Sequence, residues 1–166
     1  MKFIIYNAGP LFTEYEISQR KLEGVKFRTL LEKNNVEYEL GNPIDFPVNP
    51  TDEIAAQPIP AEIYEADASF IDRANIFFFD FANNDPGTMV ELGMAVMKIR
   101  KGEEVWMYGI NSDFRILSNS RLGYDSTIGL NSFMTGAIFK HGFNMYASFD
   151  QALATFCKDH NLNLIE

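Results

Sequence analysis

The segment best suited to chemistry is an acidic junction between a predicted strand and a predicted helix. It reads Asn83-Asn84-Asp85-Pro86-Gly87-Thr88-Met89-Val90-Glu91-Leu92-Gly93. A continuous apolar run, residues 75–81, precedes it and is typical of a strand buried on both faces of a parallel sheet. The apolar spacing that follows predicts a helix with Thr88 as its cap. Glu91 is therefore expected in the first turn of that helix.

Two interpretations of Glu91 follow from this position. Thr88-x-x-Glu91 has the spacing of a capping box, in which the glutamate bonds back to the Thr88 backbone N–H. Alternatively, ligands of open parallel α/β sheets bind at the carboxyl ends of strands, where a helix N-terminus favours an ionised carboxylate. An ionised carboxylate is what a nucleophile requires. A cap would tolerate Glu91→Gln and a nucleophile would not, so spacing alone leaves both open.

A second acid, Asp67, is predicted to lie on the inner face of a helix. The spacing of Ile63, Ala66 and Phe70 predicts an apolar stripe over residues 60–73, and Asp67 falls within it. Acids are rarely buried without a partner or a purpose. Asp67 is therefore either a hydrogen-bonded structural acid or a site acid at the edge of a pocket.

Several other chemistries lack their signatures in this chain. It has no G-x-x-x-x-G-K-[ST] phosphate loop, no G-x-G-x-x-G and no G-x-S-x-G elbow. His141 and His160 stand apart from any cysteine or paired acid, so no metal site has the expected ligand spacing. No cofactor and no metal are expected. Acids beside an aromatic residue suggest glycosidic chemistry instead, in which one carboxylate attacks the anomeric carbon and another acid protonates the leaving group.

The elements that must position these residues alternate along the chain. Strands are predicted at residues 2–6, 36–40, 75–81 and 104–108, with Ala137–Lys140 leading into a fifth. Helices are predicted at residues 14–33, 60–73, after Thr88, at 128–134 and from Phe149. Strict alternation predicts an α/β fold: a flavodoxin-like, doubly wound sheet of five parallel strands with helices on both faces. By the length prior the chain is a single domain, 1–166.

The sequence also makes predictions about the packing face of the first helix and about the proline-rich segment that follows the second strand. The first helix is expected to bury a broad apolar face made of Leu22, Val25, Phe27, Leu30 and Leu31. Residues 41–60 contain five prolines and are expected to be either a loop that covers the substrate or a mobile surface excursion.

Composition limits the partners. The formal charge of −9 argues against nucleic acid or an anionic membrane, because either would need a basic surface. The single cysteine excludes an internal disulfide and suits the reducing cytoplasm. No apolar run is long enough to span a membrane. A small or neutral substrate in the cytoplasm is expected.

Four segments in order resemble the nucleoside 2-deoxyribosyltransferases. They are Tyr6-Asn7-Ala8-Gly9-Pro10-Leu11-Phe12, Asp67, Asp85-Pro86-Gly87-Thr88 with Glu91-Leu92-Gly93, and Gly129-Leu130-Asn131-Ser132-Phe133-Met134. The resemblance spans nearly the whole chain, and the family's flavodoxin-like fold agrees with the alternation. It implies transfer of 2-deoxyribose between a 2′-deoxynucleoside and a free nucleobase. It also implies a homo-oligomer, a dimer or higher.

The resemblance also implies residue roles. The matching glutamate is the family's nucleophile, so Glu91 would attack C1′ and form a covalent deoxyribosyl-enzyme. Tyr6 would hydrogen-bond and orient Glu91. Asp67 and Asp85 would contact the nucleobase, and one of them would supply its proton. The substrate-binding residues would be Gly9, Phe12 beside the nucleoside, and Asn131 at the sugar 5′-hydroxyl.

These roles have structural alternatives and departures. Tyr6 and Phe12 are alternatively core aromatics, and Asp85 is alternatively the cap of the turn before Pro86. Several relatives end in a short aromatic tail whose carboxylate binds the sugar, and that role does not transfer to Glu166. The residues after Asn131 are Ser and Phe where relatives commonly have Leu and Met.

Two other functions compete with transfer. Related N-glycosidases use the same glutamate but let water finish the reaction. Those that act on 5′-monophosphates carry Ser and basic groups near the first loop, and residues 7–12 have neither, which favours a nucleoside. A receiver-type signalling module would use Asp80 at the end of a central strand. That module needs an acidic pair for Mg²⁺ after the first strand, where Tyr6-Asn7 stands instead.

Overall fold

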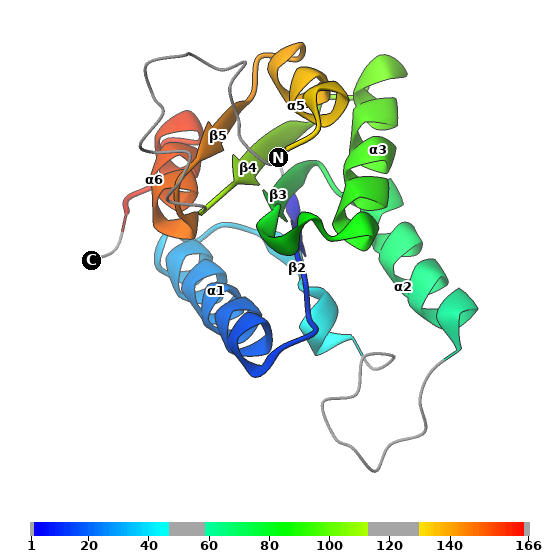
Figure 1. The fold of residues 1–166 in the computed structure, drawn as a ribbon. Coiled ribbons are helices and arrows are strands. Elements are labelled where there is room, and N and C mark those ends of the chain that lie inside the picture. Colours follow the sequence, from blue (N-terminus) through cyan, green and yellow to red (C-terminus); the bar gives the residue numbers. More distant parts are fainter. Residues whose placement is uncertain (1, 47–58, 113–129, 165–166) are drawn as a thin grey trace.

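The computed structural model describes residues 2–46, 59–112 and 130–164 (Figure 1). Most of the proline-rich stretch 41–60, the predicted helix start at 128–129 and Glu166 lie outside the described residues. Within the described ranges, no helix is long and apolar enough to cross a membrane.

Five strands form a single sheet in which every pairing is parallel, in the order β2-β1-β3-β4-β5. The strands are β1 (Phe3–Ala8), β2 (Tyr38–Gly41), β3 (Ile76–Asp80), β4 (Trp106–Ile110) and β5 (Asn144–Tyr146). This order confirms the predicted doubly wound, flavodoxin-like sheet. Its topological switch point, where ligands of such folds bind, lies between β1 and β3.

Helices cover both faces of the sheet (Figure 1). They are α1 (Glu14–Lys33), α2 (Pro60–Arg73), α3 (Pro86–Arg100), α5 (Ser132–Phe139) and α6 (Phe149–Asp159), with 3₁₀ turns at Pro43–Asp45 and Ala82–Asn84. The alternation along β3 separates two cores. Ile76 and Phe78 pack with α1 and α6, whereas Phe77 and Phe79 pack with α2, α3 and α5. Helices cover both faces of β3, which explains why nearly all of its residues are apolar.

Several predicted strand boundaries are wrong by one or two residues. β1 was expected to end at Tyr6 but continues through Asn7 and Ala8, which pair with Phe78 and Phe79 of β3. β2 and β4 both begin two residues later than expected, at Tyr38 and Trp106. The longer β1 carries its side chains further toward the switch point.

The fifth strand is also displaced from its predicted position. Ala137 to Phe139 belong to α5, and the strand follows at Asn144–Tyr146. Met134 and Ile138, one helical turn apart, are both buried in the core beside α3, so packing continues the helix through this segment.

The face of α1 that packs on the sheet is partly polar. Leu22 and Val25, which were expected in its apolar face, are 50% and 56% exposed. Glu16, Arg20 and Glu23 are buried instead, four and three residues apart on one stripe. The apolar face is therefore confined to the C-terminal half of α1, where Phe27, Leu30 and Leu31 are buried.

Candidate active site

Tyr6 and Glu91 meet between β1 and α3 on one side of the switch point. The Tyr6 hydroxyl donates a hydrogen bond of 2.5 Å to Glu91 Oε1, across 85 positions of sequence. Tyr6 is fully buried, and its ring packs against Phe70 and Phe77 with centroid distances of 6.0 and 6.3 Å. The packed ring therefore fixes the direction from which the hydroxyl meets the carboxylate.

Asp85, and not Thr88, begins α3. Asp85 Oδ2 accepts hydrogen bonds from the Thr88 N–H and the Thr88 hydroxyl, each of 2.8 Å, and Oδ1 accepts one from the Gly87 N–H at 3.3 Å. Pro86 takes the first helical position, where its missing N–H costs nothing. The predicted capping box of Thr88 with Glu91 is therefore wrong. Because the helix starts one turn earlier, the Glu91 side chain is free to reach Tyr6.

The environment of Glu91 makes its charge sensitive to pH near neutrality. Burial raises the pKa of Glu91 from 4.5 to about 7; the hydrogen bond from Tyr6 opposes this rise, and the charges of Asp67 and Asp85 add to it. Burial, with the charges of Glu91 and Asp67, raises the pKa of Tyr6 well above its ordinary value of 10. Tyr6 therefore stays a hydrogen-bond donor at every pH at which Glu91 titrates.

Asp67 of α2 is the third group at this point. Its Oδ1 atom is buried and has no hydrogen-bond partner among the described residues. Burial raises the pKa of Asp67, while the nearby Tyr6 hydroxyl opposes the rise. A partly buried acid with an unused oxygen and a raised pKa is suited to hold a proton for transfer.

Gly9 follows β1 and lies against the buried side chain of Arg20. A Cβ atom on Gly9 would lie 2.4 Å from Arg20 Nη1, so a larger residue at this position would displace the buried Arg20 side chain. The Phe12 ring is 76% exposed, so its alternative role as a core aromatic is wrong. Its ring is available to cover a ligand.

Asn131 lies at the start of α5. It caps α5, with Oδ1 accepting a 2.9 Å hydrogen bond from the Phe133 N–H. It borders a groove of about 750 Å³ between α3 and α5, which Asn84 and Met97 also line. No hydrogen bond among the described residues joins Asn131 to Tyr6, Glu91 or Asp67.

Comparison with known proteins places the chain in a family. A sequence model of the family named nucleoside 2-deoxyribosyltransferase matches residues 5–124. The chain belongs to this family. The match includes Tyr6, Asp67, Asp85 and Glu91, and it ends before Asn131.

One protein with a similar sequence and one solved structure with a similar fold extend this comparison of the deoxyribosyltransferase-family chain. An uncharacterized protein of Ureaplasma parvum serovar 3 is 38% identical over 146 residues, which are 84% of this chain and 85% of that protein. The crystal structure of a conserved protein from Enterococcus faecalis V583 matches with a TM-score of 0.66 and 20% identity. It covers 95% of this chain and 98% of its own, and this likeness concerns the fold.

In this deoxyribosyltransferase-family domain, a buried ion-pair cluster that the sequence interpretation missed holds the ends of β1 and β3. Arg20, which is 1% exposed, pairs with Asp80 at 2.6 Å and with Glu23 at 2.9 Å, and donates to the Ala8 carbonyl at 3.3 Å. The signal was present in the sequence, since Glu16, Arg20 and Glu23 share one stripe of a predicted helix. Asp80 is engaged by Arg20, which speaks against its use as a receiver-type phosphorylation site.

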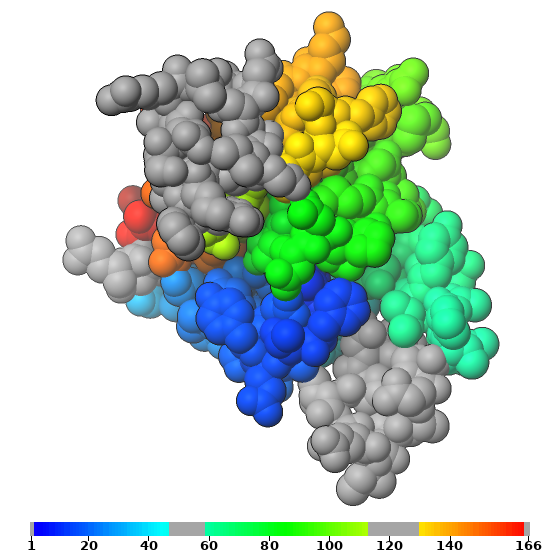
Figure 2. Space-filling model, in the orientation of Figure 1, coloured from blue at the N-terminus to red at the C-terminus, as the bar shows by residue number. Residues whose placement is uncertain are grey.

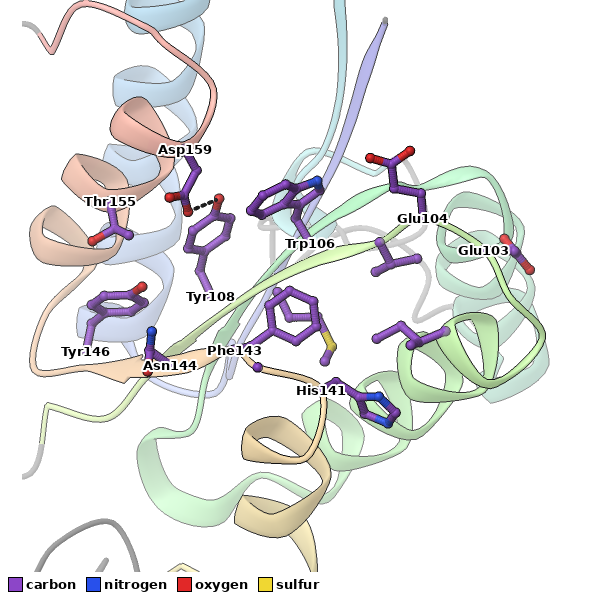
Figure 3. A pocket seen from close by; sticks show the side chains of 14 residues that line it. Glu103, Glu104, Trp106, Tyr108, His141, Phe143, Asn144, Tyr146, Thr155 and Asp159 are labelled. Atoms are coloured by element: carbon purple, nitrogen blue, oxygen red, sulfur yellow. Dashed lines mark hydrogen bonds between the residues drawn. The ribbon is translucent and has the colours of Figure 1, made fainter.

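A separate hollow of about 540 Å³ lies at the β5 edge of the sheet (Figure 3). β5 pairs only with Tyr108 to Ile110, so the first residues of β4 have no strand beside them on this side within the described chain. The hollow is lined by Trp106 and Phe143, among others. At its side, the Tyr108 hydroxyl donates a hydrogen bond of 3.0 Å to Asp159 Oδ2. It contains none of the predicted site residues of the deoxyribosyltransferase family.

No three His, Cys, Asp or Glu side chains are grouped to hold a metal ion in the part of the chain that the structure describes.

Proposed function

We propose that this enzyme transfers 2-deoxyribose between the nucleobases of 2′-deoxynucleosides through a covalent deoxyribosyl-Glu91 intermediate. The 2.5 Å hydrogen bond from Tyr6 to Glu91 supports this most directly, because it holds one carboxylate oxygen in a fixed direction beside the switch point. Membership of the family supplies the substrate class.

The reaction proceeds in two displacements. A Glu91 oxygen bonds to C1′ while the bond from C1′ to the nucleobase nitrogen breaks, and its electron pair leaves with the base. An incoming nucleobase nitrogen then attacks C1′ and the bond to Glu91 breaks, which returns the carboxylate. Two inversions at C1′ restore the β configuration.

Asp67 is the acid we assign to protonate the departing base. Its unpartnered oxygen and its raised pKa fit a proton donor. Both oxygens of Asp85 already accept hydrogen bonds from the first turn of α3, so Asp85 serves mainly to position the helix that carries Glu91. Gly9 and the exposed Phe12 would bound the nucleoside site, and Asn131 would reach the 5′-hydroxyl.

The test is a coupled exchange of nucleobases. The protein is incubated with thymidine or deoxyinosine, with and without adenine, beside Glu91→Gln as the matched inactive control. Deoxyadenosine that forms only with the wild type supports transfer. Free deoxyribose that accumulates at a rate independent of adenine would show hydrolysis instead. Absence of nucleoside turnover, or no pentose adduct on Glu91 by mass spectrometry of a stalled reaction, would overturn the proposal.

We propose further that the enzyme is a cytoplasmic homo-oligomer without nucleic-acid or membrane partners. The groove between α3 and α5 is flanked by exposed apolar side chains, with Phe133 90% and Met97 47% exposed. Apolar surface of this kind commonly marks a contact with another protein chain. Light scattering after size-exclusion chromatography tests this, and a monomer at assay concentrations would contradict it.

A further inference from the structure

We propose that Glu16 is a positioning residue for the transfer reaction, because its carboxylate ties the loop after β1 to the loop that leads into α3, the helix that carries Glu91. This inference rests on the proposed function. It concerns no contact with the substrate, and nothing in the family resemblance points to Glu16.

This tie, the Glu16 clasp, consists of three hydrogen bonds to one buried carboxylate. Glu16 Oε2 accepts the backbone N–H groups of Phe12 and Thr13 at 2.9 and 2.8 Å. Glu16 Oε1 accepts the Asn83 side-chain amide at 2.5 Å, across 67 positions of sequence. Glu16 is 6% exposed. Figure 2 shows the two segments it joins as blue and green surfaces in direct contact.

This arrangement exceeds what a helix cap needs. Thr13 and Glu16 form a complete capping box at the start of α1, in which the Thr13 hydroxyl accepts the Glu16 N–H and the Glu16 carboxylate accepts the Thr13 N–H. That box uses a single carboxylate oxygen. The second oxygen accepts a hydrogen bond from Asn83, which lies in the turn before α3.

Asn83 is the point at which fixing the loop matters. Asn83 and Asn84 both have left-handed backbones, with φ of 58° and 52°, a conformation that costs non-glycine residues energy. The cap Asp85 follows at once, and Glu91 lies in the helix that this cap begins. A rotation of this loop would therefore move the start of α3 and displace Glu91 relative to Tyr6.

The Glu16 carboxylate keeps its charge in the pH range in which Glu91 is protonated and deprotonated. Burial alone would raise the pKa of Glu16, but the hydrogen bonds from Thr13, Phe12 and Asn83 outweigh it and hold the pKa below its usual value. Glu16 therefore stays ionised through the pH range in which Glu91 changes charge.

The experiment compares four single variants and one double variant with the wild type in the nucleobase-exchange assay. Glu16→Ala removes the clasp, and we expect kcat to fall roughly 10- to 100-fold, as small misplacements of reacting groups do. Glu16→Gln keeps the tie, since its oxygen accepts from Phe12 and Thr13 while its amide donates to a flipped Asn83, so kcat is expected within about threefold of wild type. Thr13→Ala is the matched control, because it loses the cap hydroxyl but keeps the link to Asn83. It is expected to lower Tm without lowering kcat.

Asn83→Gly approaches the clasp from its other end. Glycine tolerates the left-handed backbone, so this variant removes the tie at little cost to folding. We expect kcat to fall as in Glu16→Ala, with KM nearly unchanged because the loop bearing Phe12 stays fixed. In the double variant, Glu16→Ala should add little to the loss already caused by Asn83→Gly, which is the signature of one shared interaction.

The outcomes separate this inference from the proposed function. If the wild type exchanges no nucleobase, the function fails, and amide hydrogen exchange still tests the clasp. In that case Glu16→Ala should accelerate exchange over residues 81–89 and Thr13→Ala should not. Additive losses in the double variant, or equal losses of kcat in Thr13→Ala and Glu16→Ala, would overturn the inference.

Discussion

The same four-residue pattern lies near the start of two helices of this protein and gives two different arrangements. Thr13-x-x-Glu16 forms a complete capping box at the start of α1. Thr88-x-x-Glu91 forms none, because Asp85 and Pro86 start α3 one turn earlier and make Thr88 an interior residue of the first turn. The residues upstream, an aspartate and a proline at the start of α3, therefore determine whether the glutamate caps the helix or is left to contact Tyr6.

The two glutamates also differ in how their charge is held. Three donors surround Glu16 and keep its pKa below its usual value despite burial. Glu91 has a single hydroxyl donor and two nearby acids, and burial raises its pKa to about 7. A carboxylate that is fully hydrogen-bonded is suited to hold structure. One that is sparsely hydrogen-bonded keeps an oxygen available for chemistry.

The sharpest way to break this comparison is to remove the charge from each glutamate in turn. Glu91→Gln should lower the rate of nucleobase exchange by at least about 10³-fold, the order of loss seen when a nucleophile is removed. Glu16→Gln, the same chemical change, should keep kcat within about threefold of wild type. Steady-state kinetics with thymidine and adenine measure both, and a Glu91→Gln enzyme with normal turnover would end the nucleophile assignment.

Glu91→Gln should at the same time stabilise the fold. The folded-state pKa of Glu91 lies above its unfolded value, so the native state binds the extra proton and wild-type stability falls as the pH rises from about 4.5 to about 7. The variant lacks this loss. Its free energy of unfolding should exceed that of the wild type by up to about 3 kcal/mol at pH 8 and match it near pH 4. Urea titrations at the two pH values test the sign.

A smaller effect is expected from Tyr6→Phe, which removes the donor from Glu91. A hydrogen bond to a charged group contributes about 1.5–3 kcal/mol, so kcat/KM at pH 7 should fall roughly 10- to 100-fold. Because the Tyr6 hydroxyl lowers the pKa of Glu91, its loss should also move the acid limb of the pH–rate profile to higher pH. A lower rate with an unmoved acid limb would mean that Tyr6 acts on something other than Glu91.

Asp85 tests the feature that distinguishes the two helix starts. Asp85→Ala should cost about 2 kcal/mol of stability, since an N-cap is lost and the Thr88 hydroxyl loses its acceptor. Asp85→Asn keeps a capping side chain and should cost less than about 0.5 kcal/mol. It should also lower the pKa of Glu91, because a negative charge leaves the site. Urea unfolding ranks the variants, and equal losses in both would contradict the assignment of the cap.

Much of the fold could be predicted from the sequence because its strongest signals are local. The apolar run of residues 75–81 marks a strand covered on both faces, and the bounds of α1 and α2 follow from their flanking residues. The position of β5 could not be predicted. Residues 137–139 are as apolar as a strand, and only the burial of Met134 and Ile138 beside α3 makes them helical.

The site residues could be predicted only where they lie at the ends of predicted strands or match the family's motifs in order along the chain. Tyr6, Asp67 and Glu91 are brought together by the structure, while their chemical roles remain predictions. The stripe of Glu16, Arg20 and Glu23 was missed because helical periodicity assigns charged residues to the solvent side. The partners of this stripe include Asp80 and Asn83, which lie 60 and 67 positions away from Arg20 and Glu16 and carry no helical signal.

The smallest predicted effect concerns Thr88, the residue on which the two interpretations of the second pattern differ. Thr88→Val keeps the β-branched shape at an interior helical position and removes only the hydroxyl that donates to Asp85. Because the Thr88 N–H still reaches Asp85, the loss of stability should be about 1 kcal/mol, with kcat unchanged. Urea unfolding beside Asp85→Ala measures the difference. If Thr88 were the cap of α3, Thr88→Val would be the costlier change, and the contrast between the two helix starts would disappear.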